Sequence, residues 1–439
     1  MSSAPFIAEP ATGPLRGTAA VPGDKSVSHR AVLFAAMADG TSRLRRVLDS
    51  ADVRATIGAV EVLGARVVED ARCGDGLTLT VTGWGAAGPR PPHDPIDCAN
   101  SGTTTRLLMG VLAGWSGRTF TLTGDASLSG RPMRRVTEPL TRMGARLELS
   151  EGGTLPVTIR GAGLAPAEHD LVVASAQVKT AILLAGLRAA GRTLVREPAP
   201  SRDHTERLLP AFGVAVGRDE ATHAAWVDGP APLTPTDVAV PGDPSSAAFI
   251  IGAALIVPGS VVTVAGVDLN PTRAGFLTVL ERMGADLAIR PAGEAGAEPV
   301  GDVTATFTAP LTATTITAEE VPSLVDEVPL LAVVAAHAEG TTRFEGVGEL
   351  RVKESDRLQA LAGALDALGV TVRAGDDWLQ VEGPAETGGA VLDSLGDHRL
   401  AMAYAVAALA ARAPVSIARY DAIGVSFPAF TEVLRSLRA

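Results

Sequence analysis

The chain has 439 residues, which at about 150 residues per domain corresponds to two or three domains. Hydrophobic residues make up 46% of the sequence but aromatic residues only 4%, so the core must consist mainly of Ala, Val, Leu and Ile, which favours an α/β protein over an aromatic-rich β sandwich. The formal net charge of −11 comes from acidic residues spread along the chain. Nucleic acid and anionic membranes are therefore repelled, and an anionic ligand needs a local basic cleft.

Cysteine and histidine usage gives no sign of a metal or redox protein. Cys73 and Cys98 form no C-x-x-C motif, and no pair or cluster of the seven histidines has zinc-ligand spacing. Residues 1–14 have neither the basic nor the apolar region of a signal peptide. The uncharged stretch 244–267 is divided by residues 258–260 into pieces too short to span a bilayer. We therefore expect a cytoplasmic protein without a structural metal.

A polar turn followed by an apolar helix of about three turns occurs six times along the chain. The turns begin at positions 25, 102, 175, 245, 323 and 397, which are 70 to 78 residues apart. The expected helices are residues 27–37, 104–113, 176–187, 246–255, 324–337 and 398–411. This regularity predicts six repeats of one unit.

A second element lies between these helices: an amphipathic helix that ends on a glycine before an alternating strand. The five terminating glycines are Gly64, Gly144, Gly213, Gly284 and Gly369. Glycine is the expected residue after a helix because it adopts the left-handed conformation without strain. The strands that follow, such as residues 146–149 and 370–373, alternate apolar and polar residues.

The strongest internal match joins residues 21–26 (VPGDKS) to residues 240–245 (VPGDPS). Each follows a connector rich in Pro, Thr or Gly, at residues 11–20 and 230–236. We interpret this as two crossings, near Val21-Pro22 and Val240-Pro241, between two domains of three repeats each. Residues 22–240 form one domain, and residues 1–21 with 241–439 form the other. A continuous solenoid is the alternative.

Cations gather at the starts of the expected helices, where unpaired amides and the helix dipole already favour anions. They are Lys25, Arg30, Arg131, Lys179, Arg202, Lys353, Arg357 and Arg399. Arg131 is expected to begin the second helix of repeat two, and Lys353 and Arg357 to share one helical face. The set implies a ligand with several phosphate or carboxylate groups, although any one of these residues could be an ordinary surface cation.

Some segments have an ordinary explanation as well as a chemical one. Residues 23–26 (GDKS) lack the spacing of a nucleotide-binding P-loop, which argues against a nucleotide kinase. Residues 100–103 (NSGT) could be only a helix cap. Asp326 precedes an almost wholly apolar helix and is either a buried acid or a first-turn acid. Glu354 lies between two cations in the sequence, and it is either close to a bound anion or part of a solvated ion pair. We expect His29, His204 and His398 to pack or orient neighbours.

Taken together, these segments resemble the 5-enolpyruvylshikimate-3-phosphate synthase family. The matching segments run in the expected order along the whole chain: 22–30, 100–103, 124–125, 131–133, 175–179, 202–206, 326–327, 351–357 and 397–399. The resemblance implies an α/β fold of two globular domains, each with three β-α-β-α-β-β units, which close like a clamp. It also implies transfer of the enolpyruvyl group of phosphoenolpyruvate to the 5-hydroxyl of shikimate 3-phosphate, without metal or cofactor, by a monomer.

The resemblance also implies roles for individual residues. Asp326 would be the base, Glu354 the proton donor and Lys25 a cation on the intermediate. Shikimate 3-phosphate would be held by Lys25, Ser26, Arg30, Ser175, Ala176, Gln177, Arg202, Asp326 and Lys353. Phosphoenolpyruvate would be held by Lys25, Gly102, Arg131, Gln177, Arg357 and Arg399. Arginine forks suit phosphate and carboxylate groups.

Two positions depart from the family pattern. Many members have a lysine just before the last Phe-Pro, where this chain has Ser426. That contact is absent or supplied elsewhere. Other motifs resemble a glyphosate-tolerant subgroup, yet tolerance is associated with alanine where this chain has Gly102. We therefore expect glyphosate to inhibit this chain more readily than it inhibits tolerant members.

Two other functions remain as alternatives. The sister enzyme that transfers enolpyruvate to UDP-N-acetylglucosamine has asparagine after the first lysine and a catalytic cysteine in a mobile loop. This chain has Ser26 there, and Cys98 lies outside such a loop. A relative of the RNA terminal-phosphate cyclases would need a basic face and a nucleotide-reactive histidine, against which the net charge of −11 weighs.

Overall fold

The computed structural model describes residues 4–74 and 76–438, which form two compact units. Unit 1 comprises Met1–Pro22, Gly242–Glu294 and Pro299–Ala439, and unit 2 comprises Gly23–Pro241 and Ala295–Glu298. That each unit is a domain of three repeats, with hinge crossings near Val21-Pro22 and Val240-Pro241, stays a prediction. Each unit has its own hydrophobic core, made mainly of Ala, Val, Leu and Ile as the composition predicts.

Unit 2 contains three four-stranded sheets, each with one parallel pair followed by antiparallel pairs. In spatial order the strands are β14 (Val238–Ala239), β3 (Thr41–Val47), β5 (Gly76–Thr82) and β4 (Arg66–Cys73); β6 (Ile96–Asp97), β7 (Thr119–Thr123), β9 (Val157–Arg160) and β8 (Arg146–Leu149); and β10 (Glu168–Asp170), β11 (Gly191–Arg196), β13 (Ala224–Gly229) and β12 (Val216–Asp219). The same arrangement of strands therefore occurs three times.

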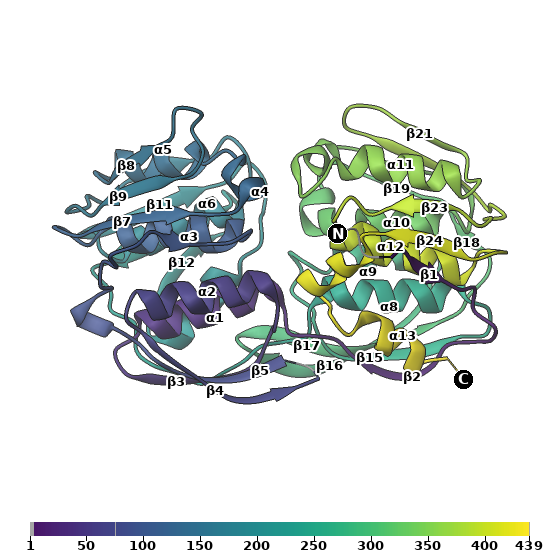
Figure 1. The fold of residues 1–439 in the computed structure, drawn as a ribbon, viewed down its shortest axis with the longest axis horizontal. Helices are drawn as coiled ribbons and strands as arrows, with labels where there is room; N and C mark the ends of the chain where they lie inside the picture. The colour runs from purple at the N-terminus through teal and green to yellow at the C-terminus, as the bar shows by residue number, and fades with distance from the viewer. Residues whose placement is uncertain (1–3, 75, 439) are drawn as a thin grey trace. The chain divides into compact units, whose positions relative to one another are not determined.

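The helices of unit 2 are α1 (Lys25–Met37), α2 (Ala51–Val62), α3 (Gly102–Ala113), α4 (Ala126–Ser129), α5 (Arg134–Arg142), α6 (Ala176–Gly186) and α7 (His204–Leu208), with 3-10 turns at Gly85–Ala87 and Leu209–Phe212. Figure 1 shows α1 and α2 lying along the sheet of β3, β4 and β5. The apolar helices α1, α3 and α6 are almost fully buried, as their composition predicts.

Unit 1 also contains three sheets, two with one parallel pair and the sheet of β20 with two. In spatial order the strands are β16 (Asp286–Ala295), β17 (Glu298–Thr306), β15 (Val261–Asp268) and β2 (Arg16–Ala20); β18 (Leu311–Thr312), β20 (Ala338–Phe344), β22 (Leu379–Gly383) and β21 (Val372–Ala374), with β19 (Thr315–Ile316) also on β20; and β1 (Phe6–Ala8), β24 (Val415–Ala418) and β23 (Val391–Asp393). The N-terminal strands β1 and β2 thus complete sheets of the C-terminal half.

The helices of unit 1 are α8 (Pro244–Ile256), α9 (Gly275–Arg282), α10 (Val328–Ala335), α11 (Arg357–Ala367), α12 (His398–Leu409) and α13 (Phe430–Ser436), with 3-10 turns at Val321–Ser323, Val325–Glu327, Gly348–Val352 and Tyr420–Val425. Figure 1 shows α8 above the strands β15 and β2. In the described part of the chain, no helix is both long and apolar enough to cross a membrane.

Most of the predicted helices are confirmed. The five glycines predicted to end helices are confirmed as well, because their φ angles lie between 83° and 103°. The helix predicted at 324–337 is wrong at its start: residues 325–327 form a 3-10 turn and α10 begins at Val328. Proline belongs at the first turn of a helix, so Pro329 fixes the start there. Before Gly213, Pro210 lies in a 3-10 turn instead of a continuous amphipathic helix.

Candidate active site

In unit 2, the N-terminal ends of α1, α3 and α6 carry most of the predicted binding residues. Asp24, Ser101 and Ser175 are the N-caps, and each side chain accepts a hydrogen bond from an amide two or three residues into the helix. None of the three first turns contains an acidic residue. The remaining amides and the helix dipoles therefore favour an anion at each end.

A cluster of arginines surrounds the start of α3. The side chain of Gln177 joins α6 to α3: its Nε2 donates to Thr103 Oγ1 at 2.9 Å, and its Oε1 accepts from Arg106 Nη1 at 2.7 Å. Arg131 Nη2 donates to Asn100 Oδ1 at 2.9 Å. Burial and the nearby charges of Arg131 and Arg135 lower the pKa of Arg106 to about 10, so it is still charged at neutral pH. An anion here would relieve the repulsion among these cations.

Arg106 was missed by the sequence analysis. It lies four residues after Gly102 on the same helix, so both face the same side of α3, and that spacing was the signal available. Gly102 itself leaves the space between the two arginines open: a Cβ atom there would lie 2.9 Å from Arg106 Nη1 and 3.4 Å from Arg131 Nη1. The absence of a side chain at Gly102 therefore keeps both guanidinium groups close to this helix end.

Lys25 and Arg30 lie on α1 and have different environments. Lys25 is half-buried, and its Nζ lies 3.2 Å from Asp52 Oδ2. Arg30 is buried and donates to Thr205 Oγ1 at 2.7 Å, to Thr180 Oγ1 at 2.9 Å and to the carbonyl of Ser26 at 3.0 Å. Burial lowers the pKa of Arg30 to about 10, and the charge of Arg202 contributes to this shift. Arg202 and Ser26 thus belong to the surroundings of Arg30.

Lys179 does not contribute a free cation, contrary to the sequence prediction. Its Nζ lies 2.7 Å from Glu197 Oε2 and 2.8 Å from Glu206 Oε1, and all three side chains are at least 94% buried. Burial opposes the charge, but the two glutamates outweigh it and raise the pKa of Lys179. Both partners are distant in sequence, so the spacing of residues could not reveal this pairing.

In unit 1, three carboxylates surround Arg357, which begins α11 and is buried. Its Nε donates to Asp397 at 2.6 Å, its Nη1 to Asp326 at 3.2 Å and its Nη2 to Glu354 at 2.5 Å. These three charges raise the pKa of Arg357 against the effect of burial. The structure therefore brings both predicted catalytic acids onto one predicted phosphoenolpyruvate ligand.

Arg399, near the start of α12, joins the same cluster. Its Nη2 lies 3.5 Å from Asp326 Oδ2 and its Nη1 lies 3.7 Å from Glu327 Oε1. Burial raises the pKa of Glu327, which also accepts a hydrogen bond from Ser245. Asp326 is only 8% exposed and so is the buried acid of the two possibilities, held by two guanidinium groups.

Two predictions about local structure at these cations are wrong. Lys353 and Arg357 do not share a helical face: α11 begins at Arg357 because Asp356 caps it, and Lys353 lies before it, 3.0 Å from Glu349. Arg131 does not begin a helix, because Pro132 disfavours the helical conformation of the residue before it and α5 starts at Arg134. Arg131 instead lies in the loop ahead of α5.

The three histidines singled out from the sequence and Ser426 occupy buried positions. His29 Nδ1 lies 2.6 Å from Thr56 Oγ1, and His204 Nδ1 lies 2.7 Å from Glu298 Oε1. His398 is 1% exposed at the start of α12. Ser426 Oγ is buried and has no hydrogen-bond partner within the described residues.

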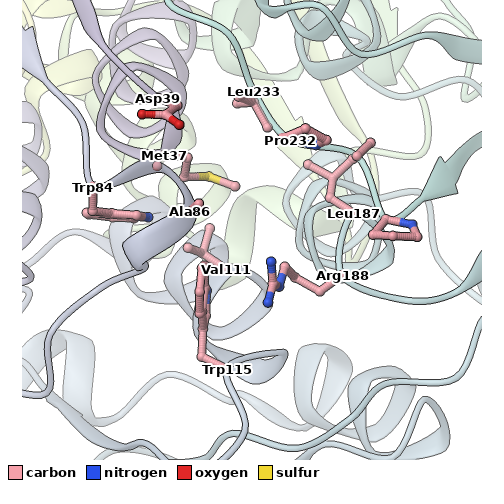
Figure 2. Close-up of a pocket in the computed structure, with 13 residues that line it drawn as sticks. Met37, Asp39, Trp84, Ala86, Val111, Trp115, Leu187, Arg188, Pro232 and Leu233 are labelled. Atoms are coloured by element: carbon pink, nitrogen blue, oxygen red, sulfur yellow. The ribbon is translucent and has the colours of Figure 1, made fainter.

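The opposite ends of the same unit 2 helices line a cavity of about 190 Å³. Figure 2 shows Met37 from α1, Val111 from α3 and Leu187, the residue directly after α6, together with Trp84 and Trp115. Arg188 stacks on Trp115, with its Cζ 3.9 Å from the ring centroid. Helix C-termini carry partial negative charge and the walls are mainly apolar. This cavity therefore does not suit a polyanion, in contrast to the N-terminal ends.

Comparisons with known proteins identify the family of the chain. Residues 10–434 match the family model described as EPSP synthase (3-phosphoshikimate 1-carboxyvinyltransferase). The chain belongs to the EPSP synthase family. A 3-phosphoshikimate 1-carboxyvinyltransferase of Halorhodospira halophila is 51% identical over 97% of this chain and 94% of the relative. The one from Limosilactobacillus fermentum is 48% identical over 96% of each chain.

Solved structures of the EPSP synthase family show the same fold. An EPSP synthase from Acinetobacter baumannii has a TM-score of 0.90 at 39% identity, covering 99% of this chain and 98% of that one. The enolpyruvyl transferase NikO from Streptomyces tendae has a TM-score of 0.79 at 21% identity, covering 99% and 97%, and shares the fold. The predicted α/β enolpyruvyl transferase-like fold and the predicted family are therefore confirmed.

Proposed function

We propose that the two clusters carry out the reaction of the EPSP synthase family, transfer of the carboxyvinyl group of phosphoenolpyruvate to the 5-hydroxyl of shikimate 3-phosphate with release of phosphate. The products are 5-enolpyruvylshikimate 3-phosphate and inorganic phosphate. Both substrates carry several negative charges, and both clusters are rich in guanidinium groups. The residues and roles that follow are part of the proposal.

The shikimate 3-phosphate ligands of unit 2 are Lys25, Ser26, Arg30, Ser175, Ala176, Gln177 and Arg202. The helix N-termini of α1 and α6 and the charged Arg30 support this assignment, because amides and guanidinium groups bind phosphate through directed hydrogen bonds. From unit 1 we propose Asp326 and Lys353. Lys353 Nζ lies 3.0 Å from Glu349, so binding must break or share that ion pair.

The phosphoenolpyruvate ligands are Lys25, Gly102, Arg131, Gln177, Arg357 and Arg399, to which we add Arg106. The addition rests on the hydrogen bond between Arg106 and Gln177 and on the mutual repulsion of Arg106 and Arg131. Like charges held together without a carboxylate are stabilised by an anion. Arg106 and Arg131 meet that description on either side of Gly102.

The two acids that contact Arg357 carry out the proton transfers. Asp326 accepts the proton of the 5-hydroxyl, whose oxygen attacks C2 of phosphoenolpyruvate, while Glu354 donates a proton to the C3 methylene. The tetrahedral intermediate then loses phosphate from C2 and a proton from the C3 methyl group to the Glu354 carboxylate, which restores the vinyl group and the acid form of Glu354. Lys25 stabilises negative charge on the intermediate. General acid–base catalysis of this kind contributes about 10²- to 10⁴-fold.

One observation carries this proposal: Asp326 is buried against Arg357 and Arg399. The same two arginines are proposed ligands of phosphoenolpyruvate. Their contacts with Asp326 therefore place the proposed base beside the proposed phosphoenolpyruvate ligands of unit 1.

The test is phosphate release from phosphoenolpyruvate, measured with shikimate 3-phosphate and, in parallel, with UDP-N-acetylglucosamine. We expect release only with shikimate 3-phosphate, and a kcat for Asp326→Asn that is about 10²- to 10⁴-fold lower. Asp393→Asn is the matched control, because Asp393 is exposed and paired with Arg419 in the same unit. Release only with the sugar nucleotide would refute the acceptor, and full activity of Asp326→Asn would refute the base.

We further propose that glyphosate competes with phosphoenolpyruvate and inhibits this chain more readily than members with alanine at the position of Gly102. A Cβ atom there would lie 2.9 Å from Arg106 Nη1, so the end of that side chain would have to shift, and 3.4 Å from Arg131 Nη1, which is an ordinary contact. We expect Gly102→Ala to raise both the inhibitor concentration for half-inhibition and the KM for phosphoenolpyruvate. Competition that appears only at millimolar glyphosate would place the wild type with the tolerant subgroup that its other motifs resemble.

Two further features of the proposed enzyme concern its assembly and its location. We propose that it works as a monomer, which sedimentation at several concentrations would test. We also propose a cytoplasmic location, which cell fractionation would test.

A further inference from the structure

Four ionised side chains are buried together in unit 2: Arg30, Lys179, Glu197 and Glu206, which are 2%, 4%, 6% and 3% exposed. Their formal charges sum to zero. Lys179 bridges the two glutamates at 2.7 and 2.8 Å, and the charge of Glu206 acts on Arg30. Burying ions costs free energy that only good mutual geometry offsets, and such groups are a poor means of adding stability. A role other than stability therefore has to explain why these four side chains are buried together.

Glu197 connects this buried group to two substrate-binding segments. Its Oε1 accepts the backbone N–H of Ser175 at 2.8 Å. Its Oε2 accepts the hydroxyl of Ser201 at 2.8 Å and the ammonium group of Lys179 at 2.7 Å. Ser175 is the N-cap of α6, directly before Ala176 and Gln177, and Ser201 directly precedes Arg202. The Glu197 carboxylate thus holds the backbone at Ser175 and the side chain of Ser201, next to Arg202.

Arg30 connects the same group to the third segment. It donates to the carbonyl of Ser26 at 3.0 Å and to the hydroxyls of Thr180 and Thr205, which lie 2.6 Å from each other. Thr180 follows Lys179 on α6, and Thr205 precedes Glu206 on α7. The buried charges therefore join α1, α6, α7 and the end of β11 beside the segments proposed to hold shikimate 3-phosphate.

We infer that Lys179 and Glu197 are positioning residues for shikimate 3-phosphate, which act through Ser175 and Ser201 without touching the substrate. The inference rests on the proposed function, because it takes residues 175–177 and 202 as substrate ligands. Lys179 holds the Glu197 carboxylate in place, and Glu197 holds the N-cap of α6 and the Arg202 segment. Loss of either contact widens the range of positions of these ligands, and a misplacement of about 1 Å costs about 10²-fold.

Three variants separate positioning from net charge and from stability. Glu197→Gln removes one negative charge and weakens the contacts to Ser201 and Lys179. Lys179→Met removes the positive charge and leaves both glutamates uncompensated, and it could fail to fold. Ser201→Ala removes only a half-buried hydroxyl and should fold. Glu168→Gln is the matched control, since Glu168 is exposed and paired with Arg196 in the same unit.

The measurements are the Kd of shikimate 3-phosphate by calorimetry, both KM values, kcat and the melting temperature. For Ser201→Ala and Glu197→Gln we expect the Kd and KM of shikimate 3-phosphate to rise about tenfold to a hundredfold. The KM for phosphoenolpyruvate should also rise in Glu197→Gln, because Glu197 holds the segment that carries Gln177. In Ser201→Ala that KM should stay within about twofold, as should all constants of Glu168→Gln, which is the scatter expected of substitutions away from such contacts.

Several results would overturn the inference. A lower melting temperature with unchanged Kd in both Ser201→Ala and Glu197→Gln would make the cluster purely structural. Tighter binding by Glu197→Gln would show that only net charge acts, because that variant leaves an extra positive charge beside a polyanion. Wild-type protein that binds no shikimate 3-phosphate would refute the proposed function itself, whereas normal wild-type binding with insensitive variants would refute only the positioning role.

Discussion

Gly110, in the middle of α3, lies against the backbone of α6. A Cβ atom at this position would lie 2.1 Å from the backbone carbonyl oxygen of Ala181 on α6. Carbon–oxygen contacts are normally at least about 3.3 Å, so Gly110→Ala requires the helices to separate by about 1 Å. A backbone carbonyl cannot rotate away as a side chain can, so the helices themselves must move.

The size of the effect follows from two opposing contributions. Overpacking of this kind costs about 1–3 kcal/mol, and a clash with backbone belongs at the upper end. Alanine is about 1 kcal/mol more favourable than glycine inside a helix. We therefore expect Gly110→Ala to lower the free energy of unfolding by about 2 kcal/mol. At about 2–4 °C per kcal/mol for a unit of this size, the melting temperature falls by about 6 °C.

Gly58 provides the matched control. It lies inside α2 in the same unit, and a Cβ atom there would meet nothing within 4 Å. The same substitution at Gly58 should raise the free energy of unfolding by about 1 kcal/mol, because only the helix propensity changes. The two variants, compared by urea titration and differential scanning calorimetry, should shift stability in opposite directions.

Activity gives a second measure of the same perturbation. The N-terminal ends of α3 and α6 carry Gly102, Arg106 and Gln177, so separating the helices should raise the KM for phosphoenolpyruvate in Gly110→Ala but not in Gly58→Ala. If Gly110→Ala is as stable as the wild type, or shifts stability in the same direction as Gly58→Ala, the packing argument is wrong.

Two further predictions concern buried titratable groups. Burial lowers the pKa of His29 from 6.5 to about 3, so between these values the unfolded chain binds a proton that the folded chain does not. The contribution of His29 to the free energy of unfolding is therefore lost as pH falls below 6.5, by about 2 kcal/mol between pH 7 and pH 5. Urea titrations at the two pH values should show a smaller loss of stability for His29→Gln than for the wild type. An equal loss would contradict the assignment to His29. Burial raises the pKa of the Cys98 thiol to about 11. In a Cys73→Ser variant, Cys98 should therefore not react with a disulfide reagent at pH 8 until urea unfolds the chain. Rapid reaction of the native protein would refute the burial of Cys98.

The sequence by itself determined the periodic features of this protein. The six polar turns, the apolar helices after them and the glycines that end the intervening helices depend on residues close together in the chain, so their pattern is visible in the sequence. The family resemblance rests on the same local motifs, and the match of residues 10–434 bears it out. Asp326 and Arg357 were likewise proposed as site residues from their local sequence context.

Only the tertiary structure decided which charges are free and which are paired. Lys179 looked like a ligand for an anion until Glu197 and Glu206 were seen to surround its ammonium group. Arg106 looked like an ordinary helix residue until Gln177, 71 positions later, accepted its hydrogen bond. Arg106 and Gln177 belong to different predicted repeats, and Lys179 and its partners to different elements of one repeat. The energies of these contacts depend on burial and on distances of a few ångströms. The sequence pattern contains neither burial nor distance. It therefore identified the charged residues but not the residues they pair with.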